Sequence, residues 1–179
     1  MKTIRSNVFE TNSSSCHVLT LLTLQERDAL LQKKAILRIV PGDDYGPEYD
    51  NISEVLNYNQ FVNTILDEVF SEVHETTQYR EQNEKVVRKI LQQYWKDVIE
   101  EPTTSFVKQE AVNGNTYFEH RYELMGEWNE LTGHRVAEIL AHRLQFYIPP
   151  YSYETLLEKP AVKRLNHHAV YAVSWEKEW

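Results

Sequence analysis

Glu10, Ser13, Ser14, Ser15 and His17 place a carboxylate, three hydroxyls and an imidazole within eight residues of the chain. Such groups can transfer protons or act as nucleophiles, and clustered hydroxyls can line a small anion site. The serines lack the flanking glycines of a nucleophile elbow, and their spacing matches no complete catalytic motif. The segment therefore predicts either a catalytic loop or a polar connector that hydrogen-bonds backbone groups between two strands.

A second group of chemically capable residues recurs at every fourth position. His134, Glu138 and His142 would lie along one stripe of a helix. Imidazoles one turn apart, with a carboxylate between them, can hold a divalent metal such as zinc or manganese. The alternative is a solvated polar stripe with Arg135 and Arg143 nearby, and a motif on one helix favours that simpler interpretation. The metal site is kept as a prediction.

The third feature is an acidic stretch between Arg38 and Arg80, where the sequence has no Lys or Arg. Its nine carboxylates, in a chain of net charge −8, predict a negative potential that reaches roughly 8–10 Å into solvent. Such a surface repels nucleic acid and attracts proteins that have basic nucleic-acid-binding grooves, although a charge run is more often only a solvated face. The predicted contact residues are Asp43, Asp44, Glu48, Asp50, Glu54, Asp67 and Glu68.

The apolar pattern predicts the elements that position these residues. Strands are expected over 3–9, 16–22, 35–40 and 167–175, and an Asn113-Gly114 turn predicts a β-hairpin over 104–124. A capping box at Thr23 and Glu26 predicts a helix that runs to Lys34. Longer amphipathic helices are expected from near Ser53, over about 80–100, and over 132–147.

This order of elements predicts an α+β fold with a mixed or antiparallel sheet, a long helical hairpin and a further amphipathic helix. The length of 179 residues fits a single domain over 1–179, in which 41–75 forms an acidic loop and helix. A single cysteine, Cys16, excludes an intrachain disulfide, and the first residues lack the apolar run of a signal peptide. We therefore expect a cytoplasmic protein without a membrane partner.

The opening residues R-x-N-V-F-E-T-N-S-S-S-x-H, from Arg5 to His17, resemble the start of a group of small proteins from Gram-positive bacteria and their phages. The resemblance covers about the first twenty residues. Cys16 stands at its variable position, and Val18 replaces an expected serine. The resemblance implies a phage or mobile-element origin and no particular activity.

Two functions follow as hypotheses. The first is an accessory protein that inhibits a basic nucleic-acid-handling host protein, of the anti-CRISPR or anti-defence type. That comparison rests on size, acidity and the implied origin. The second is a metal-assisted hydrolase or transferase that acts on a phosphate-bearing substrate through the loop from Glu10 to His17. The charge segregation favours the first hypothesis, and direct binding to nucleic acid is not expected.

Overall fold

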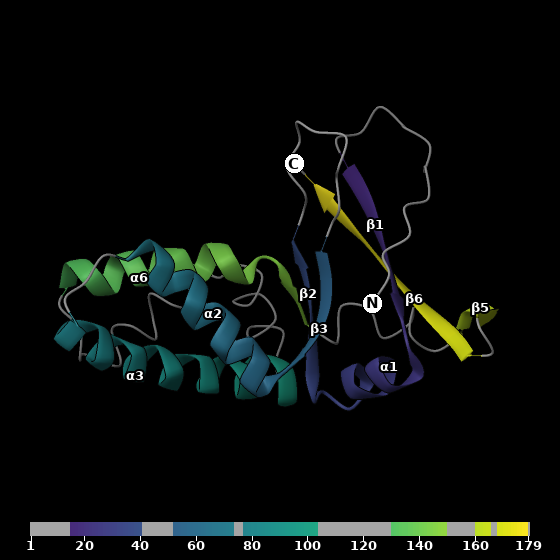
Figure 1. The fold of residues 1–179 in the computed structure, drawn as a ribbon, viewed down its shortest axis with the longest axis horizontal. Coiled ribbons are helices and arrows are strands. Elements are labelled where there is room, and N and C mark those ends of the chain that lie inside the picture. The colour runs from purple at the N-terminus through teal and green to yellow at the C-terminus, as the bar shows by residue number, and fades with distance from the viewer. Residues whose placement is uncertain are drawn as a thin grey trace. The chain divides into compact units, whose positions relative to one another are not determined.

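The computed structural model describes residues 15–40, 52–73, 77–103, 130–149, 160–165 and 168–178 (Figure 1). Helices and antiparallel strands occur together in these segments, which confirms the predicted α+β class. The chain divides into two compact units. One contains the described residues up to Val55 and from Ile148 onward, and the other spans Leu56–Tyr147.

An antiparallel sheet dominates the first unit. It consists of β1 (Ser15–Leu22), β6 (His168–Glu178) and β5 (Pro160–Leu165), with β6 in the centre. The predicted strands at 16–22 and 167–175 are thereby confirmed as β1 and β6. β5 was not predicted, and its first residue is a proline, which cannot donate to a ladder and is tolerated where a strand begins. The predicted strand at 3–9 lies outside the described residues.

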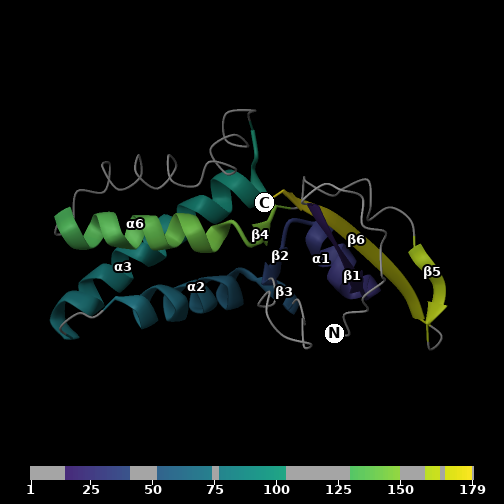
Figure 2. The same ribbon diagram turned by 90° about the horizontal axis from the view of Figure 1, so that it is seen from above.

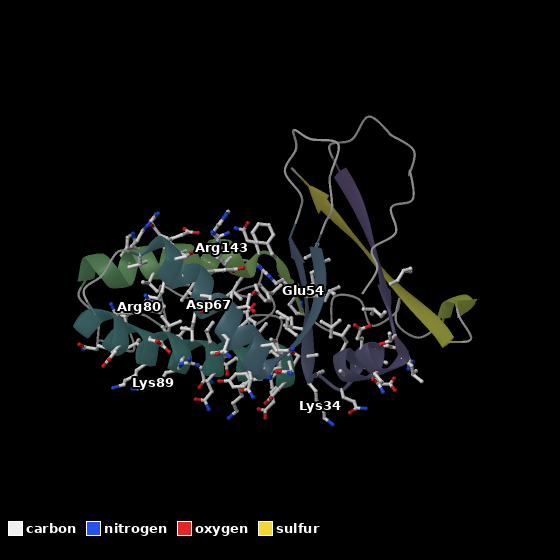
Figure 3. The ribbon with its side chains drawn as sticks, viewed as in Figure 1. Lys34, Glu54, Asp67, Arg80, Lys89 and Arg143 are labelled. Atoms are coloured by element: carbon white, nitrogen blue, oxygen red, sulfur yellow. The ribbon has the colours of Figure 1, made fainter. Side chains whose placement is uncertain are left out.

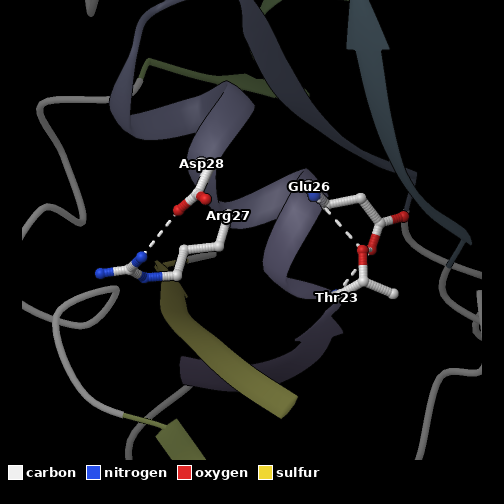
Figure 4. A network of polar contacts seen from close by, with 4 residues as sticks. All are labelled: Thr23, Glu26, Arg27 and Asp28. Carbon is white, nitrogen blue, oxygen red and sulfur yellow. Dashed lines mark hydrogen bonds and ion pairs between the residues drawn. The ribbon is translucent and has the colours of Figure 1, made fainter. Parts of the chain in front are cut away.

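Helix α1 (Leu24–Leu31) begins at the predicted capping box. The Thr23 amide donates to Glu26 Oε2 over 2.7 Å, and the Glu26 amide donates to Thr23 Oγ1 over 3.3 Å (Figure 4). Extension of the helix to Lys34 was wrong. The chain leaves the helix after Leu31 because Lys33 has a φ of 58°, and the Lys34 amide donates back to the Ala29 carbonyl.

A second sheet has the strand order β3 (Ile52–Asn57), β2 (Ala35–Val40) and β4 (Tyr147–Ile148). The predicted strand at 35–40 is confirmed. A helix start near Ser53 was wrong, because β3 continues to Asn57. The Asn57 side chain then caps the following helix, as its Oδ1 accepts from the Gln60 amide over 3.1 Å.

The apolar core of the first unit lies between α1 and strand β2. Its buried members come from the end of β1, from α1 and from β2, and they are Leu22, Leu30, Ala35, Leu37 and Ile39. Val55 of β3 and Ile148 of β4 pack against this cluster while partly buried. The alternating inward positions of β2 thus hold α1 and β3 in place.

The second unit is helical. It contains α2 (Tyr58–Glu72), α3 (Thr77–Tyr94), a π-helix η1 (Trp95–Glu100) and α6 (Glu130–Leu144). Helix α2 contacts both α3 and α6, as Figures 1 and 2 show. The amphipathic helix predicted at 132–147 is α6, which ends three residues earlier than expected because β4 begins at Tyr147. None of the helices in the described ranges has the length and apolar content that a membrane span requires.

Phe61 is the centre of the aromatic core of this unit. Its ring is fully buried and stacks on Tyr94, with 6.3 Å between the ring centroids. Trp95 and Tyr147 contribute ring centroids at 5.4 Å and 5.2 Å from Phe61. These contacts join the first turn of α2 to the end of α3, to η1 and to β4, so they order the helices that carry the candidate site.

Candidate functional site

The acidic stretch is described only in part. Asp43, Asp44, Glu48 and Asp50 lie outside the described residues. Glu54 on β3 forms an ion pair with Arg38 on β2, with 3.3 Å between Oε2 and Nη1. The Glu54 side chain remains 44% exposed, whereas that of Arg38 is 17% exposed. The pairing of β2 with β3 therefore supplies a counter-charge to Glu54. Arg38 borders the acidic stretch in the sequence and is not close to Glu54 along the chain.

Helix α2 carries the other described acidic residues of this stretch. Asp67 is exposed, Glu68 is partly buried, and Glu72 forms an ion pair with Arg143 of α6. Figure 3 shows Asp67 on α2 together with Arg80 on α3 and Arg143 on α6. Because α2 has no Lys or Arg of its own, the counter-charge of Glu72 comes from the neighbouring helix α6.

A pocket of about 300 Å³ opens between α2 and α3. Leu66, Asp67 and Phe70 line it from α2, while Arg80 and Arg88 line it from α3. The sequence analysis assigned Asp67 to an open acidic face and assigned no role to the two arginines. The apolar periodicity could not reveal this pocket, because the lining residues come from the flanks of two buried stripes and meet only when the helices pack.

A polar and aromatic cluster lies where α3 passes into η1. The Tyr58 and Trp95 rings meet edge to face with 5.4 Å between centroids, and the Trp95 indole N–H donates to Glu100 Oε1 over 2.9 Å. Burial raises the pKa of the Tyr58 phenol, Arg88 lowers it and Glu100 raises it. Tyr58 therefore stays protonated at neutral pH. Only the π-helical turn places Glu100 beside Trp95, and no sequence pattern predicted that turn.

His134, Glu138 and His142 lie on α6 as predicted. Glu138 pairs with His134 over 3.5 Å and with Arg135 over 3.4 Å, and all three side chains are largely exposed. The His142 ring instead meets the Phe146 ring edge to face. In the described part of the chain, no three His, Cys, Asp or Glu side chains approach closely enough to hold a metal. The metal stays a prediction, and the observed contacts are those of a solvated polar stripe.

The opening polar segment reaches the structure only at its end. Glu10, Ser13 and Ser14 lie outside the described residues, while Ser15 and His17 belong to β1. The register of β1 and β6 places Glu178 opposite Ser15 and Glu176 opposite His17. The sequence analysis did not connect these two glutamates with the opening segment, because about 160 residues separate them along the chain.

No protein-family model matches this chain, and no curated protein or solved structure shows significant similarity to it. Its function is therefore inferred from charge, contacts and register.

Proposed function

We propose that the protein is a phage or mobile-element accessory protein that binds and inhibits a basic nucleic-acid-handling host protein through an acidic surface. The observation that carries this proposal is the charge of α2. Asp67, Glu68 and Glu72 are the charged residues of this helix, and Asp67 is exposed to solvent. Together with the net charge of −8, they favour a partner with a positive groove.

The two ion pairs narrow the surface that we propose for docking. Arg38 offsets the charge of Glu54, and Arg143 offsets that of Glu72. Partial neutralisation reduces the field of these two carboxylates at a distance, even where the pairs are partly exposed. The proposed contact therefore centres on Asp67, joined by Glu68 of the same helix and by Asp43, Asp44, Glu48 and Asp50 of the acidic stretch.

We further propose that α2 and α3 form an antiparallel hairpin that presents this face. Two contacts support the pairing. Phe61, in the first turn of α2, stacks on Tyr94 at the end of α3, whereas Phe70 near the end of α2 lies under Arg80 near the start of α3. A rigid hairpin would hold Asp67 and Glu68 in a fixed position, so that docking costs little conformational entropy.

Inhibition would follow because the acidic surface of this protein occupies the positive groove of its partner. Carboxylates seated on the lysines and arginines of a nucleic-acid-binding protein displace the phosphates that those cations would otherwise contact. Long-range attraction would also accelerate association, and it would weaken as salt is raised. We propose this mechanism for an anti-CRISPR or anti-defence role of the protein.

The test uses the fraction of a Gram-positive host lysate that heparin retains, since this fraction is enriched in basic nucleic-acid-binding proteins. The immobilised protein should capture a basic protein at about 50 mM salt and release it at about 500 mM. The double variant Asp67→Lys/Glu68→Lys should abolish capture. The matched control Glu81→Lys/Glu101→Lys reverses exposed acids outside the proposed surface and should keep it. Capture that survives the first reversal would contradict the proposal.

The register of the antiparallel sheet favours a second candidate function. Glu176 opposite His17 and Glu178 opposite Ser15 bring two carboxylate-bearing positions to the strand that continues the opening polar segment. Glu10, Ser13, Ser14, Ser15 and His17 would then serve a metal-assisted hydrolase or transferase that acts on a phosphate-bearing substrate.

Two measurements separate this candidate from the first. Phosphate release from p-nitrophenyl phosphate should require His17 and should be lost in His17→Ala. Untagged protein should contain stoichiometric zinc or manganese that the variant His134→Ala/His142→Ala loses. Protein that is free of metal and releases no phosphate would rule this candidate out.

A further inference from the structure

The pocket between α2 and α3 has a charged rim and a wall that is mostly polar. Leu66 and Phe70 also line it, and because they are 5% and 6% exposed they contribute only a small apolar area. Asp67 of α2 and Arg80, Glu84 and Arg88 of α3 form the rim. The formal charges of these four rim residues cancel, so the pocket as a whole attracts neither an anion nor a cation.

The four charged residues of the rim differ in whether another charged residue of the pocket already pairs with them. Glu84 Oε1 accepts from both Nε and Nη2 of Arg88, over 2.9 Å and 2.8 Å, which neutralises this pair locally. Within the described segments, no ion pair is formed by Asp67 or by Arg80, and both residues are exposed. Among the residues that the structure describes, the Asp67 carboxylate and the Arg80 guanidinium therefore remain to meet a ligand.

Phe70 holds the guanidinium of Arg80 at one end of the pocket. The Arg80 Cζ atom lies 5.5 Å from the centre of the Phe70 ring, which is a cation–π distance. Stacking on a ring occupies the face of a guanidinium and leaves the N–H groups at its edge free to donate to a carboxylate. Asp67 lies three residues before Phe70, so it is displaced by about one helical turn along α2 from the level of this contact.

We propose that this pocket binds a small zwitterion, a molecule that carries one ammonium and one carboxylate. The ammonium would pair with Asp67 and the carboxylate with Arg80, while the carbon chain between them covers Leu66 and Phe70. A simple anion would pair with Arg80 but would be repelled by Asp67. A simple cation would pair with Asp67 but would be repelled by Arg80. The volume of about 300 Å³ lies at the lower end of the range for ligand pockets and fits a molecule of amino-acid size.

This proposal is independent of the acidic docking surface, although both use Asp67. The charged partners are exposed, so each ion pair competes with water and with salt. We expect a dissociation constant on the order of millimolar, as is usual for a small ligand held by two exposed charges.

The experiment titrates the full-length ¹⁵N-labelled protein with γ-aminobutyrate, butyrate and butylamine and follows amide shifts by NMR. The three compounds share a four-carbon chain and differ only in the charged ends. γ-Aminobutyrate should give saturable shifts in α2 and α3, with an affinity at least about fivefold higher than that of either single-charge analogue. Arg80→Gln and Asp67→Asn should each remove this advantage. Lys85→Gln, an exposed residue of α3 outside the pocket lining, should not.

Three results would overturn the proposal. They are the absence of saturable shifts with γ-aminobutyrate, equal affinities for the three compounds, and an unchanged advantage in either pocket variant that folds. Because Arg80 and Asp67 are exposed, either variant should fold, and the dispersion of its amide spectrum reports this directly. If one variant unfolds, the other still decides the question.

Discussion

Arg38 on β2 and Glu54 on β3 form an ion pair between neighbouring strands, with 3.3 Å between Nη1 and Oε2. The arginine side chain is mostly buried and the glutamate side chain is half exposed. This pair shows how a span without Lys or Arg obtains a counter-charge. The sequence places Arg38 at the border of the span, and the strand order brings it alongside Glu54.

Replacing Glu54 by Gln should lower the free energy of unfolding by about 0.5–1 kcal/mol, because the mostly buried guanidinium of Arg38 loses its charged acceptor. Urea unfolding followed by circular dichroism measures the change, which should shrink at high salt. Glu101→Gln, at an exposed position without a side-chain ion pair in the described structure, should change stability by less than about 0.3 kcal/mol. Equal effects of the two substitutions would show that the Arg38–Glu54 pair contributes nothing.

Replacing Lys33 by Gly should stabilise the protein. Lys33 has a φ of 58°, a left-handed conformation that glycine adopts without the steric cost borne by other residues. The gain should be about 0.5–1 kcal/mol, reduced by the extra freedom that glycine gives the unfolded chain. Thermal unfolding measures it. Gln32→Gly, one residue earlier with a φ of −80°, is the control and should destabilise.

Tyr58 should titrate above the usual phenol value of about 10, because burial favours its neutral form. A raised folded-state pKa means that the associated stability is complete below about pH 10 and is lost as the pH rises through that pKa. Glu100→Gln should lower the Tyr58 pKa, and Arg88→Gln should raise it further. The phenolate absorbance, taken as the difference between each protein and its Tyr58→Phe counterpart, measures these shifts. Shifts of the same sign in both variants would disprove the assignment.

The predicted single domain can be tested with one buried residue from each compact unit. Leu37 and Phe61 are both fully buried, and truncation to Ala should cost about 2–5 kcal/mol at either position. If the chain is one cooperative domain, each variant should shift the same unfolding transition, whether followed by far-ultraviolet circular dichroism or by tryptophan fluorescence. Two transitions, each moved by only one of the variants, would show that the units unfold independently.

Local sequence patterns predicted elements whose signals lie within a few residues. The capping box at Thr23 and Glu26 placed the start of α1, and the β-branched run at 35–40 placed β2. The same kind of signal exists at Asn57 and Gln60, where a second capping box marks the start of α2. This helix start was missed because Val55 also fits the apolar spacing of α2, although it lies in strand β3.

Features that depend on packing between elements were not predictable in the same way. The π-helical turn at Trp95–Glu100 continues an apolar pattern typical of an α-helix, and the hydrogen bond from Trp95 to Glu100 follows from that turn. The pairing of Glu72 with Arg143 requires α2 and α6 to be neighbours. The acidic stretch was therefore visible in the sequence, whereas the cations that approach it were not.

The ladder between β1 and β6 joins positions as distant as Ser15 and Glu178. A ribosome adds about 5–20 residues each second, so β1 waits roughly 7–30 s before its ladder partner is made. The helices of Leu56–Tyr147 are synthesised during that interval and can pack first. Until β6 arrives, β1 carries unpaired backbone donors and acceptors, and a β1 strand on another nascent chain is a competing partner.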